Sequence, residues 1–360
     1  MSMDATLLNK IYEITRGDLE SSYFPFPRLA PILESMTFVR IVRLGRFWAR
    51  KESEERMSLE GSTTDMITGL YGQSCPWMFL LKGSPNQVKC FYGISKSATD
   101  KASIFQTLKG AFPDVRLSDA STLDRTSLDR LKHVLFLTGT PSRKANQKEN
   151  IRADQIEKLC RGLYGSDWAY IIYAQPVLAV EVTAHLNALS MQIREIYASY
   201  LLKTSAIDEQ NRIAKRYLEL LEMKHKRYEQ GRALGMWMVQ TIMLTDSDSS
   251  LGRARGLLHS AFSGDESVPD PIRIRSCSVD AQQCPSLNPL TSTEAGTLAH
   301  PPHEEYPGYE INEYSRFGVE TCGGLLSDSK SIKIGDILDR GIVRVTRFAF
   351  PYETLRSMGS

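Results

Sequence analysis

Apolar residues recur along this chain with two different spacings, and the spacing separates helices from strands. Between residues 77 and 95, WMFLL and VKCFYGI flank KGSPNQ, which predicts two strands joined by a turn. Further strands are expected at HVLFLTGTP, WAYIIYAQPVLAV, MWMVQTIMLT and IRIRS, and helices at residues 99–111, 152–163 and 250–262. This alternation predicts an α/β protein built from repeated strand–helix units that form mixed sheets.

Residues 184–231 follow a different pattern. Leu189, Ile193, Ile196 and Tyr200 are spaced by four, three and four residues, and a similar series follows the break at Thr204-Ser205. The intervening positions are dense in Lys, Arg and Glu. The pattern predicts a long helical hairpin inserted into the α/β protein and projecting from its body.

The first segment, residues 1–72, is expected to be mostly helical. Within it, MTFVRIVRLGRFWARK fits two structures. As a helix, it places Arg43, Arg46 and Arg50 on one face, and as a strand, residues 38–44 form a run rich in β-branched side chains. The pattern does not decide between them.

Three helices are expected to end in similar words, IFQTLKGAF, IEKLCRGLY and ARGLLHSAF. Aligned on Phe112, Tyr164 and Phe262, they share a small apolar residue or leucine just before the aromatic. We expect the aromatic to close the last helical turn against the sheet. Internal repetition explains the similarity, and so does the common ending of amphipathic helices at a glycine or proline.

The remaining chain, from residue 276 to about 331, is rich in Pro, Ser, Thr and Gly. It is expected to form a loop-rich C-terminal arm that ends in short β-strands at SIKIGDIL and IVRVTRFAF. The division that follows is a helical segment, a first α/β part, the hairpin, a further strand–helix–strand unit and the arm, at residues 1–72, 73–183, 184–231, 232–275 and 276–360.

Composition narrows the class of protein without identifying it. The 360 residues are 42% hydrophobic and 24% charged, with 44 Lys+Arg against 42 Asp+Glu, as in ordinary globular proteins. A net charge of +2 gives no overall attraction to nucleic acid. No apolar run approaches the roughly 18 residues needed to cross a bilayer, and the six cysteines are sparse. We therefore expect a cytoplasmic protein without membrane insertion.

Motifs for catalysis, cofactors and metals do not emerge. GLLSDSKS resembles a phosphate-binding loop, but Ser329 stands where the glycine before the lysine is required. The spacing of Cys277, Cys284, His300 and His303 matches no common zinc pattern. We expect no catalytic, cofactor-binding or metal residues in this chain. A pair of carboxylates assembled across the fold, as in a nuclease or hydrolase, remains open.

One cluster is a candidate for contact with nucleic acid or a partner protein. It combines basic and aromatic side chains, which hold phosphates and stack on bases. The alternative is a solvated face neutralised by the glutamates at positions 52, 54 and 55. The cluster consists of Arg40, Arg43, Arg46, Trp48 and Arg50.

The order of several short blocks resembles the region that precedes the motor domain in bacterial HerA/FtsK-like ATPases, the P-loop translocases related to type IV secretion ATPases. The blocks are CFYGI, KGAFPDV, CRGLYGSDWAYIIYAQPV, GMWMVQTIML, LLHSAFSG, PDPIRI, NPLTSTEAGTLAHPPHEEYPGYEI and SIKIGDILDRG. They span residues 76–345 in this order. Each block is weak by itself, so the resemblance depends on their succession.

The resemblance implies a division of labour. The motor, with its ATP and Mg²⁺ sites, would follow this chain, so we expect the 360 residues to be a fragment of a longer ATPase. The region itself would contribute contacts in a homo-oligomeric ring and docking for DNA or a partner, in DNA translocation or antiviral defence. The alternative is a scaffold without a motor that binds a protein through the helical hairpin.

Overall fold

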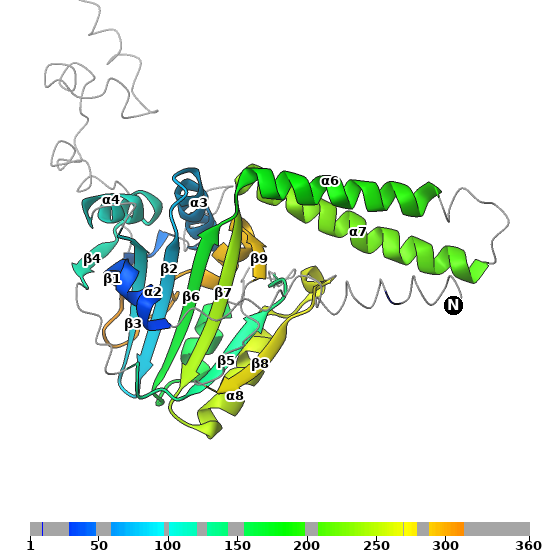
Figure 1. Ribbon diagram of the computed structural model, residues 1–360. Helices are drawn as coiled ribbons and strands as arrows, with labels where there is room; N and C mark the ends of the chain where they lie inside the picture. The colour runs from blue at the N-terminus through cyan, green and yellow to red at the C-terminus, as the bar shows by residue number, and fades with distance from the viewer. Residues whose placement is uncertain are drawn as a thin grey trace, which may run out of the picture. The chain divides into compact units, whose positions relative to one another are not determined.

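Ten strands of the described chain form one sheet (Figure 1). The computed structural model describes residues 29–47, 59–96, 101–120, 128–142, 155–198, 208–268, 270–278 and 288–312, besides Asn9. The chain divides into two compact units, Met1–Glu313 and Tyr314–Ser360, and all described residues belong to the first. The predicted α/β class is confirmed.

The stretch that fitted both helix and strand forms strand β1 (Met36–Gly45), which follows a short helix, α2 (Leu29–Ser35). Val39 and Ile41 are fully buried, while Arg40 between them is only partly buried, as the two-residue period of a strand requires. Strands β3 (Gln87–Ser95) and β4 (Arg116–Asp119) both pair with β1 and satisfy its backbone groups. The expectation of a mostly helical first segment is therefore wrong for β1.

Eight of the ten strands, with four of the helices, form two similar halves. The first contains β1, α3 (Leu59–Gly72), β2 (Trp77–Ser84), β3, α4 (Lys101–Ala111) and β4. The second contains β5 (His133–Thr138), α5 (Gln155–Gly162), β6 (Trp168–Pro176), β7 (Met236–Thr245), α8 (Asp248–Phe262) and β8 (Arg273–Ser278).

In each half the first strand lies between the third and the fourth, and the second strand lies beyond the third. This βαββαβ arrangement is that of the ferredoxin-like motif. The second strands of the two halves, β2 and β6, pair antiparallel and so join the halves into one sheet. The repeated strand–helix units predicted from the sequence are confirmed, and they belong to two six-element halves that the sequence pattern did not indicate.

The helix endings aligned in the sequence have two different outcomes. Phe112 after α4 and Phe262 of α8 are fully buried and stack on Tyr92 and Tyr170, with ring centroids 6.1 and 6.4 Å apart. Both helices take the second helical position of their half. Tyr164 after α5 is 49% exposed, so for that helix the expectation is wrong.

The arm expected to be irregular has regular structure over part of its length, so that expectation is wrong there. Strand β9 (Asn288–Thr291) pairs with β7, helix α9 (Ser292–Ala299) follows, and β10 (Glu310–Asn312) runs parallel to β1. A capping box starts α9, because Thr291 and Glu294 each accept the other's backbone N–H. This local signal follows a proline and stands among Ser and Thr residues, which made the segment look like a loop.

Helix α9 packs against both α3 and α5, the first helices of the two halves. Two tyrosines of the sheet hold its C-terminal end. Tyr92 donates its hydroxyl to the Ala299 carbonyl at 2.6 Å, and Tyr170 donates to the Leu298 carbonyl at 3.2 Å. These bonds satisfy carbonyls that a helix end leaves unpaired. Thus α9 links the two halves.

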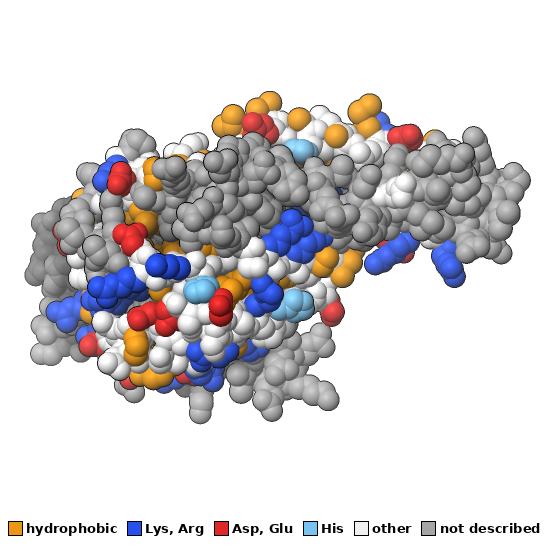
Figure 2. All heavy atoms as spheres, turned by 60° about the horizontal axis from the view of Figure 1, so that its bottom comes forward, with side chains coloured by type: hydrophobic (Ala, Val, Ile, Leu, Met, Phe, Trp, Pro, Cys, Tyr) orange, Lys and Arg blue, Asp and Glu red, His pale blue; other side chains and the backbone are white. Residues whose placement is uncertain are grey.

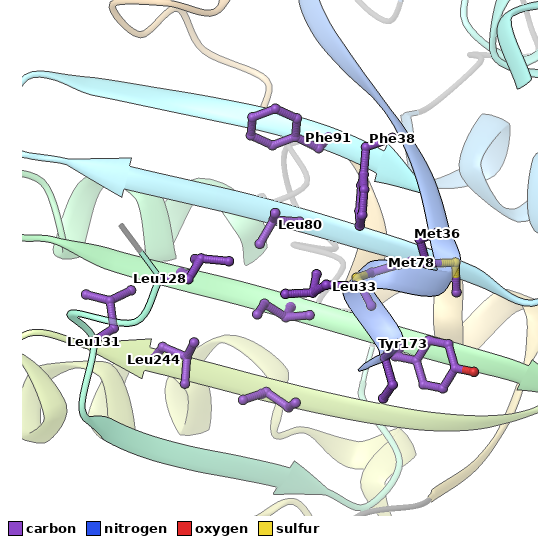
Figure 3. Close-up of a cluster of buried hydrophobic side chains, with 14 of the residues drawn as sticks. Leu33, Met36, Phe38, Met78, Leu80, Phe91, Leu128, Leu131, Tyr173 and Leu244 are labelled. Atoms are coloured by element: carbon purple, nitrogen blue, oxygen red, sulfur yellow. The ribbon is translucent and has the colours of Figure 1, made fainter. Parts of the chain in front are cut away.

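One cluster of buried apolar side chains lies between the sheet on one side and α2 and residues 128–131 on the other. Figure 3 shows Leu33 and Leu131 beside the sheet residues Met78, Leu80 and Leu244. All five are at most 7% exposed. The sheet strands carry apolar residues at successive positions, as is typical of strands that are buried on both faces.

The predicted helical hairpin is confirmed as α6 (Ala179–Ile196) and α7 (Asp208–Leu234), which lie side by side and extend past the sheet (Figure 1). It is inserted between β6 and β7, where the first half has only a tight turn between β2 and β3. Val182, Leu186 and Leu189 of α6 pack on Tyr217 and Leu221 of α7.

Several expected features lie outside the described residues. They are the phosphate-loop-like segment 324–331 and the β-like segments SIKIGDIL and IVRVTRFAF. In the described part of the chain, no helix combines the length and the apolar character needed to cross a membrane.

Candidate functional site

Three of the five candidate contact residues are described: Arg40 and Arg43 lie on β1, and Arg46 directly follows it. The other two, Trp48 and Arg50, lie outside the described residues. A β-bulge between residues 41 and 43 inserts one extra residue in β1 relative to β4. Because side chains alternate along a strand, this insertion brings Arg40 and Arg43 to the same side.

Both arginines hold residues 300–312, here called the strap. Nη2 of Arg40 donates to the Gly308 carbonyl at 2.5 Å. The guanidinium of Arg43 lies against the Asn312 side chain. With the amide oxygen of Asn312 turned toward Arg43, this oxygen lies 3.0 and 2.8 Å from Nη1 and Nη2 and accepts from both. The backbone N–H of Arg46 donates to the Asn312 carbonyl at 2.7 Å. Two of the predicted contact side chains therefore have partners within this chain, and the Arg46 residue is exposed.

Glu157 of α5 fastens the other end of the strap. Its Oε2 accepts the backbone N–H groups of His303 and Glu304 at 2.9 and 3.2 Å, and its Oε1 accepts the hydroxyl of Tyr306. Glu157 is only 1% exposed. A buried carboxylate that accepts three hydrogen bonds is satisfied, and these three bonds fix the strap to α5.

Burial also changes the proton affinity of this group. Desolvation raises the pKa of Glu157, against the hydrogen bonds from Tyr306 and His303, which favour the charged form. Burial and the hydrogen bond to Glu157 raise the pKa of the Tyr306 hydroxyl, so it stays a donor at neutral pH. The exposed Glu304 adds a like charge near Glu157, and it also forms an ion pair with Arg161, 3.5 Å away.

Two histidines of the strap lie beside this carboxylate. The rings of His300 and His303 meet edge to face, with centroids 5.6 Å apart. Burial lowers the pKa of His300 and lowers that of His303 to about 4, although the charge of Glu60 opposes both shifts. Both rings are therefore neutral at neutral pH. Glu60 itself accepts the Thr297 hydroxyl at 2.5 Å and so connects α3 to α9.

In the described ranges, no three His, Cys, Asp or Glu side chains are placed to hold a metal ion. Of the four residues tested for zinc spacing, His300 and His303 lie together on the strap, and Cys284 lies outside the described residues. Cys277 is on β8, in a different part of the sheet.

The base of the helical hairpin is held by a second buried cluster. Arg227 of α7 donates from Nε to Glu294 of α9 at 2.7 Å and from Nη2 to the Pro289 carbonyl. Burial disfavours the charged guanidinium, but the Glu294 carboxylate more than offsets this, so the pKa of Arg227 is raised. Tyr71 of α3 also donates to the Val177 carbonyl just before α6. The hairpin is thus fixed to α3 and α9.

The sequence pattern did not indicate Glu157, Tyr306, Arg227 or Glu294 as important residues. The capping-box spacing of Thr291 and Glu294 was an available signal for the start of α9. The tyrosine and glycine residues of HEEYPGYEI were a weaker one, since Tyr306 and Tyr309 form a reciprocal backbone pair around a turn at Gly308. No local spacing connects Glu157 with the strap.

Comparison with known proteins adds no family to this description. No family model matches the chain, and no curated protein is significantly similar to it.

Proposed function

We propose that this chain is a non-catalytic assembly region, whose rigid α/β body presents the helical hairpin to a partner subunit. The hairpin is anchored at its base by the Arg227–Glu294 ion pair, with side chains only 10% and 14% exposed. A partner that contacts the hairpin therefore acts on the body without a flexible joint between them.

The observation that carries this proposal is the difference between the two outer faces of the hairpin. Val180 and Met191 of α6 are each 71% exposed. Between Glu181 and Arg194, α6 has no Asp, Glu, Lys or Arg. Helix α7 alternates acidic and basic residues along its length, as solvated helices do. Figure 2 shows hydrophobic side chains along the upper rim of the molecule, over the hairpin. An exposed apolar face of this kind is typical of a protein interface.

The place of such a region in a larger protein comes from the resemblance to HerA/FtsK-like ATPases. We propose that a P-loop motor follows the chain, that ATP and Mg²⁺ bind in that motor, and that the whole forms a homo-oligomeric ring in the cytoplasm. DNA translocation and antiviral defence rest on this resemblance alone. The coding sequence beyond Ser360 tests it: a Gly-Lys-Thr/Ser loop within about 30 residues supports the motor, and its absence removes the motor from the proposal.

Docking of DNA is the part of the proposal that involves Arg40, Arg43 and Arg46. Arg46 is the member best placed for it, because Arg40 and Arg43 are engaged with the strap. In an anisotropy titration with labelled duplex DNA, Arg46→Glu should weaken salt-sensitive binding without loosening the strap. Equal binding by the wild-type and variant chains would exclude Arg46 from DNA docking.

The experiment for assembly is to measure the mass of the isolated chain by light scattering as its concentration rises, together with its ATP turnover. We expect a mass above that of the 40.5 kDa monomer and no turnover. A monomer at every concentration argues against assembly through this chain, and turnover would require a catalytic site.

A scaffold without a motor is the second candidate function, and the same hairpin favours it. In this case the hairpin binds a different protein, and the chain itself stays monomeric. The mass measurement and the sequence beyond Ser360 together distinguish the two candidates.

A further inference from the structure

Gln240 lies at the point where strand β7 changes its neighbour in the sheet. Along one edge, β7 pairs with β5 as far as Thr241, which stands opposite Leu137. On the same edge, pairing with β9 begins at Val239, which stands opposite Asn288. The other edge of β7 stays paired with β6 throughout. The sheet therefore splits beside Gln240, between the end of one ladder and the start of the next.

The side chain of Gln240 is buried without a protein partner. Gln240 is 0% exposed, and in the described part of the chain neither its amide oxygen nor its amide nitrogen has a hydrogen-bond partner. Gln155 shows the usual arrangement of a buried amide, since its Nε2 donates to the carbonyls of Ser142 and Ala261. An amide buried without partners is costly, and internal water is what satisfies such groups when the protein does not.

A second buried group without a partner belongs to the strand that leaves β7 here. Thr140 is 3% exposed, and its hydroxyl oxygen has no hydrogen-bond partner among the described residues. In the register of β5 on β7, Thr138 comes level with Gln240, and Thr140 follows two residues later. The backbone N–H of Thr140 donates to the Asp270 carbonyl at 2.8 Å, so the chain continues beside β8 after β5 ends. An amide and a hydroxyl thus lie on the two strands that separate.

We propose that ordered water binds at this split and joins the amide of Gln240 to the hydroxyl of Thr140. A buried water makes about three hydrogen bonds, and an amide and a hydroxyl together offer it donors and acceptors. The water lets β7 exchange β5 for β9 without leaving these groups unpaired. The split is also next to the base of the hairpin, because Pro289 of β9 supplies the carbonyl that accepts from Arg227. The inference is independent of the proposed assembly function.

Urea denaturation of the full chain compares the two buried amides. Gln155→Met leaves two carbonyls without their donor and should raise the unfolding equilibrium constant roughly tenfold or more. Gln240→Met should also raise it roughly tenfold, because the water loses its main partner. If the amide of Gln240 has no partner at all, methionine removes only a cost. An unfolding constant equal to or below that of the wild type would then overturn the proposal.

A double-mutant cycle tests whether one hydration site serves both groups. Thr140→Val removes the hydroxyl and nearly keeps the shape of the side chain. Either change releases a shared water, so the double variant should lose much less stability than the two single losses combined. Simple addition of the two losses would overturn the link between Gln240 and Thr140.

A high-resolution crystal structure of the full chain identifies the partner of the amide directly. We expect a water oxygen about 2.5–3.2 Å from an amide atom of Gln240 and from Oγ1 of Thr140. Direct hydrogen bonds from both amide atoms to protein groups would overturn the hydration site, even if Gln240→Met is destabilising.

Discussion

Tyr306 donates its hydroxyl to the carboxylate of Glu157, 149 positions earlier in the chain. Together with the β1 arginines, this bond fixes the strap along the body at both of its ends. The C-terminal part of the described chain is therefore held in place by side chains from α5 and β1, and these contacts lead to the first prediction.

Glu157→Ala should lower the free energy of unfolding by about 3 kcal/mol, because it leaves the buried Tyr306 hydroxyl and two partly buried backbone N–H groups without an acceptor. Urea denaturation measures the change. The control is Glu304→Ala, which removes a half-exposed carboxylate 3.5 Å from Arg161 and should cost no more than about 0.5 kcal/mol. Equal losses in the two variants would show that Glu157 does not fasten the strap.

The strap should loosen as the pH falls from 7 to 5. The folded protein holds the pKa of His303 at about 4, whereas the unfolded chain protonates this ring near pH 6.5. The unfolded state therefore binds more protons in this window, and stability present above pH 6.5 is lost as the pH falls toward 4. By pH 5 the lowered pKa of His303 has cost the folded state about 2 kcal/mol of the stability it has above pH 6.5.

Glu157 acts in the opposite direction, since its raised pKa makes the folded state gain stability as the pH falls. His300 reinforces His303, because its pKa is lowered as well. Unfolding free energies at pH 5, 6 and 7 check the balance, with His303→Gln as the matched variant. The wild type should lose more stability than the variant over this range, and parallel curves would contradict the assignment.

Removing Arg227 should strongly destabilise the base of the hairpin. Arg227→Met leaves the Glu294 carboxylate buried without its cation, at a cost of about 3–5 kcal/mol. Arg216→Met, also on α7, breaks a pair with Glu219 in which both side chains are more than half exposed, and should cost less than about 1 kcal/mol. Chemical denaturation measures the loss of unfolding free energy in both variants. Equal losses would show that burial of the Arg227–Glu294 pair does not set its contribution to stability.

Two glycines should respond oppositely to alanine. At Gly83 of β2 a Cβ atom would lie 2.1 Å from Nε1 of Trp168, so Gly83→Ala forces the indole to move and should destabilise by about 1–3 kcal/mol. At Gly69 of α3 nothing lies within 4 Å, and Gly69→Ala should stabilise by about 0.5–1 kcal/mol through helix propensity. Thermal unfolding would contradict this account if both variants shifted the midpoint in the same direction.

The elements that the sequence predicted are those with a local signal. Phe112 and Phe262 end amphipathic helices beside apolar strands, and both lie against the sheet as expected. The hairpin was predicted because its spacing of apolar residues persists over many turns. Local periodicity reports which side of an element is buried, and it does so wherever the element is long.

The strap and the hairpin base could not be predicted in the same way. Glu157 and His303 are 146 residues apart, and Arg227 and Glu294 are 67 apart. A hydrogen bond between distant segments leaves no period in either of them. For β1, local propensity favoured neither structure, and pairing with β3 and β4 decided the outcome. The sequence indicated Arg40 and Arg43 as members of one basic cluster, but it did not indicate Gly308 and Asn312 as their partners.

Disulfide cross-linking on the exposed side of α6 tests the central claim, assembly through the helical hairpin, most directly. The full chain is prepared with serine at positions 277, 284 and 322, while Cys75, Cys90 and Cys160 are retained because they are buried. Asn187→Cys then places one thiol on the exposed side of α6. Glu222→Cys places one on the exposed side of α7 as the control.

Both variants are exposed to a mild oxidant, and covalent dimer is measured on non-reducing gels. Assembly through α6 predicts rapid dimer formation by Asn187→Cys and little by Glu222→Cys. Equal rates for the two variants, or no dimer from Asn187→Cys at concentrations near 1 mM, would contradict it.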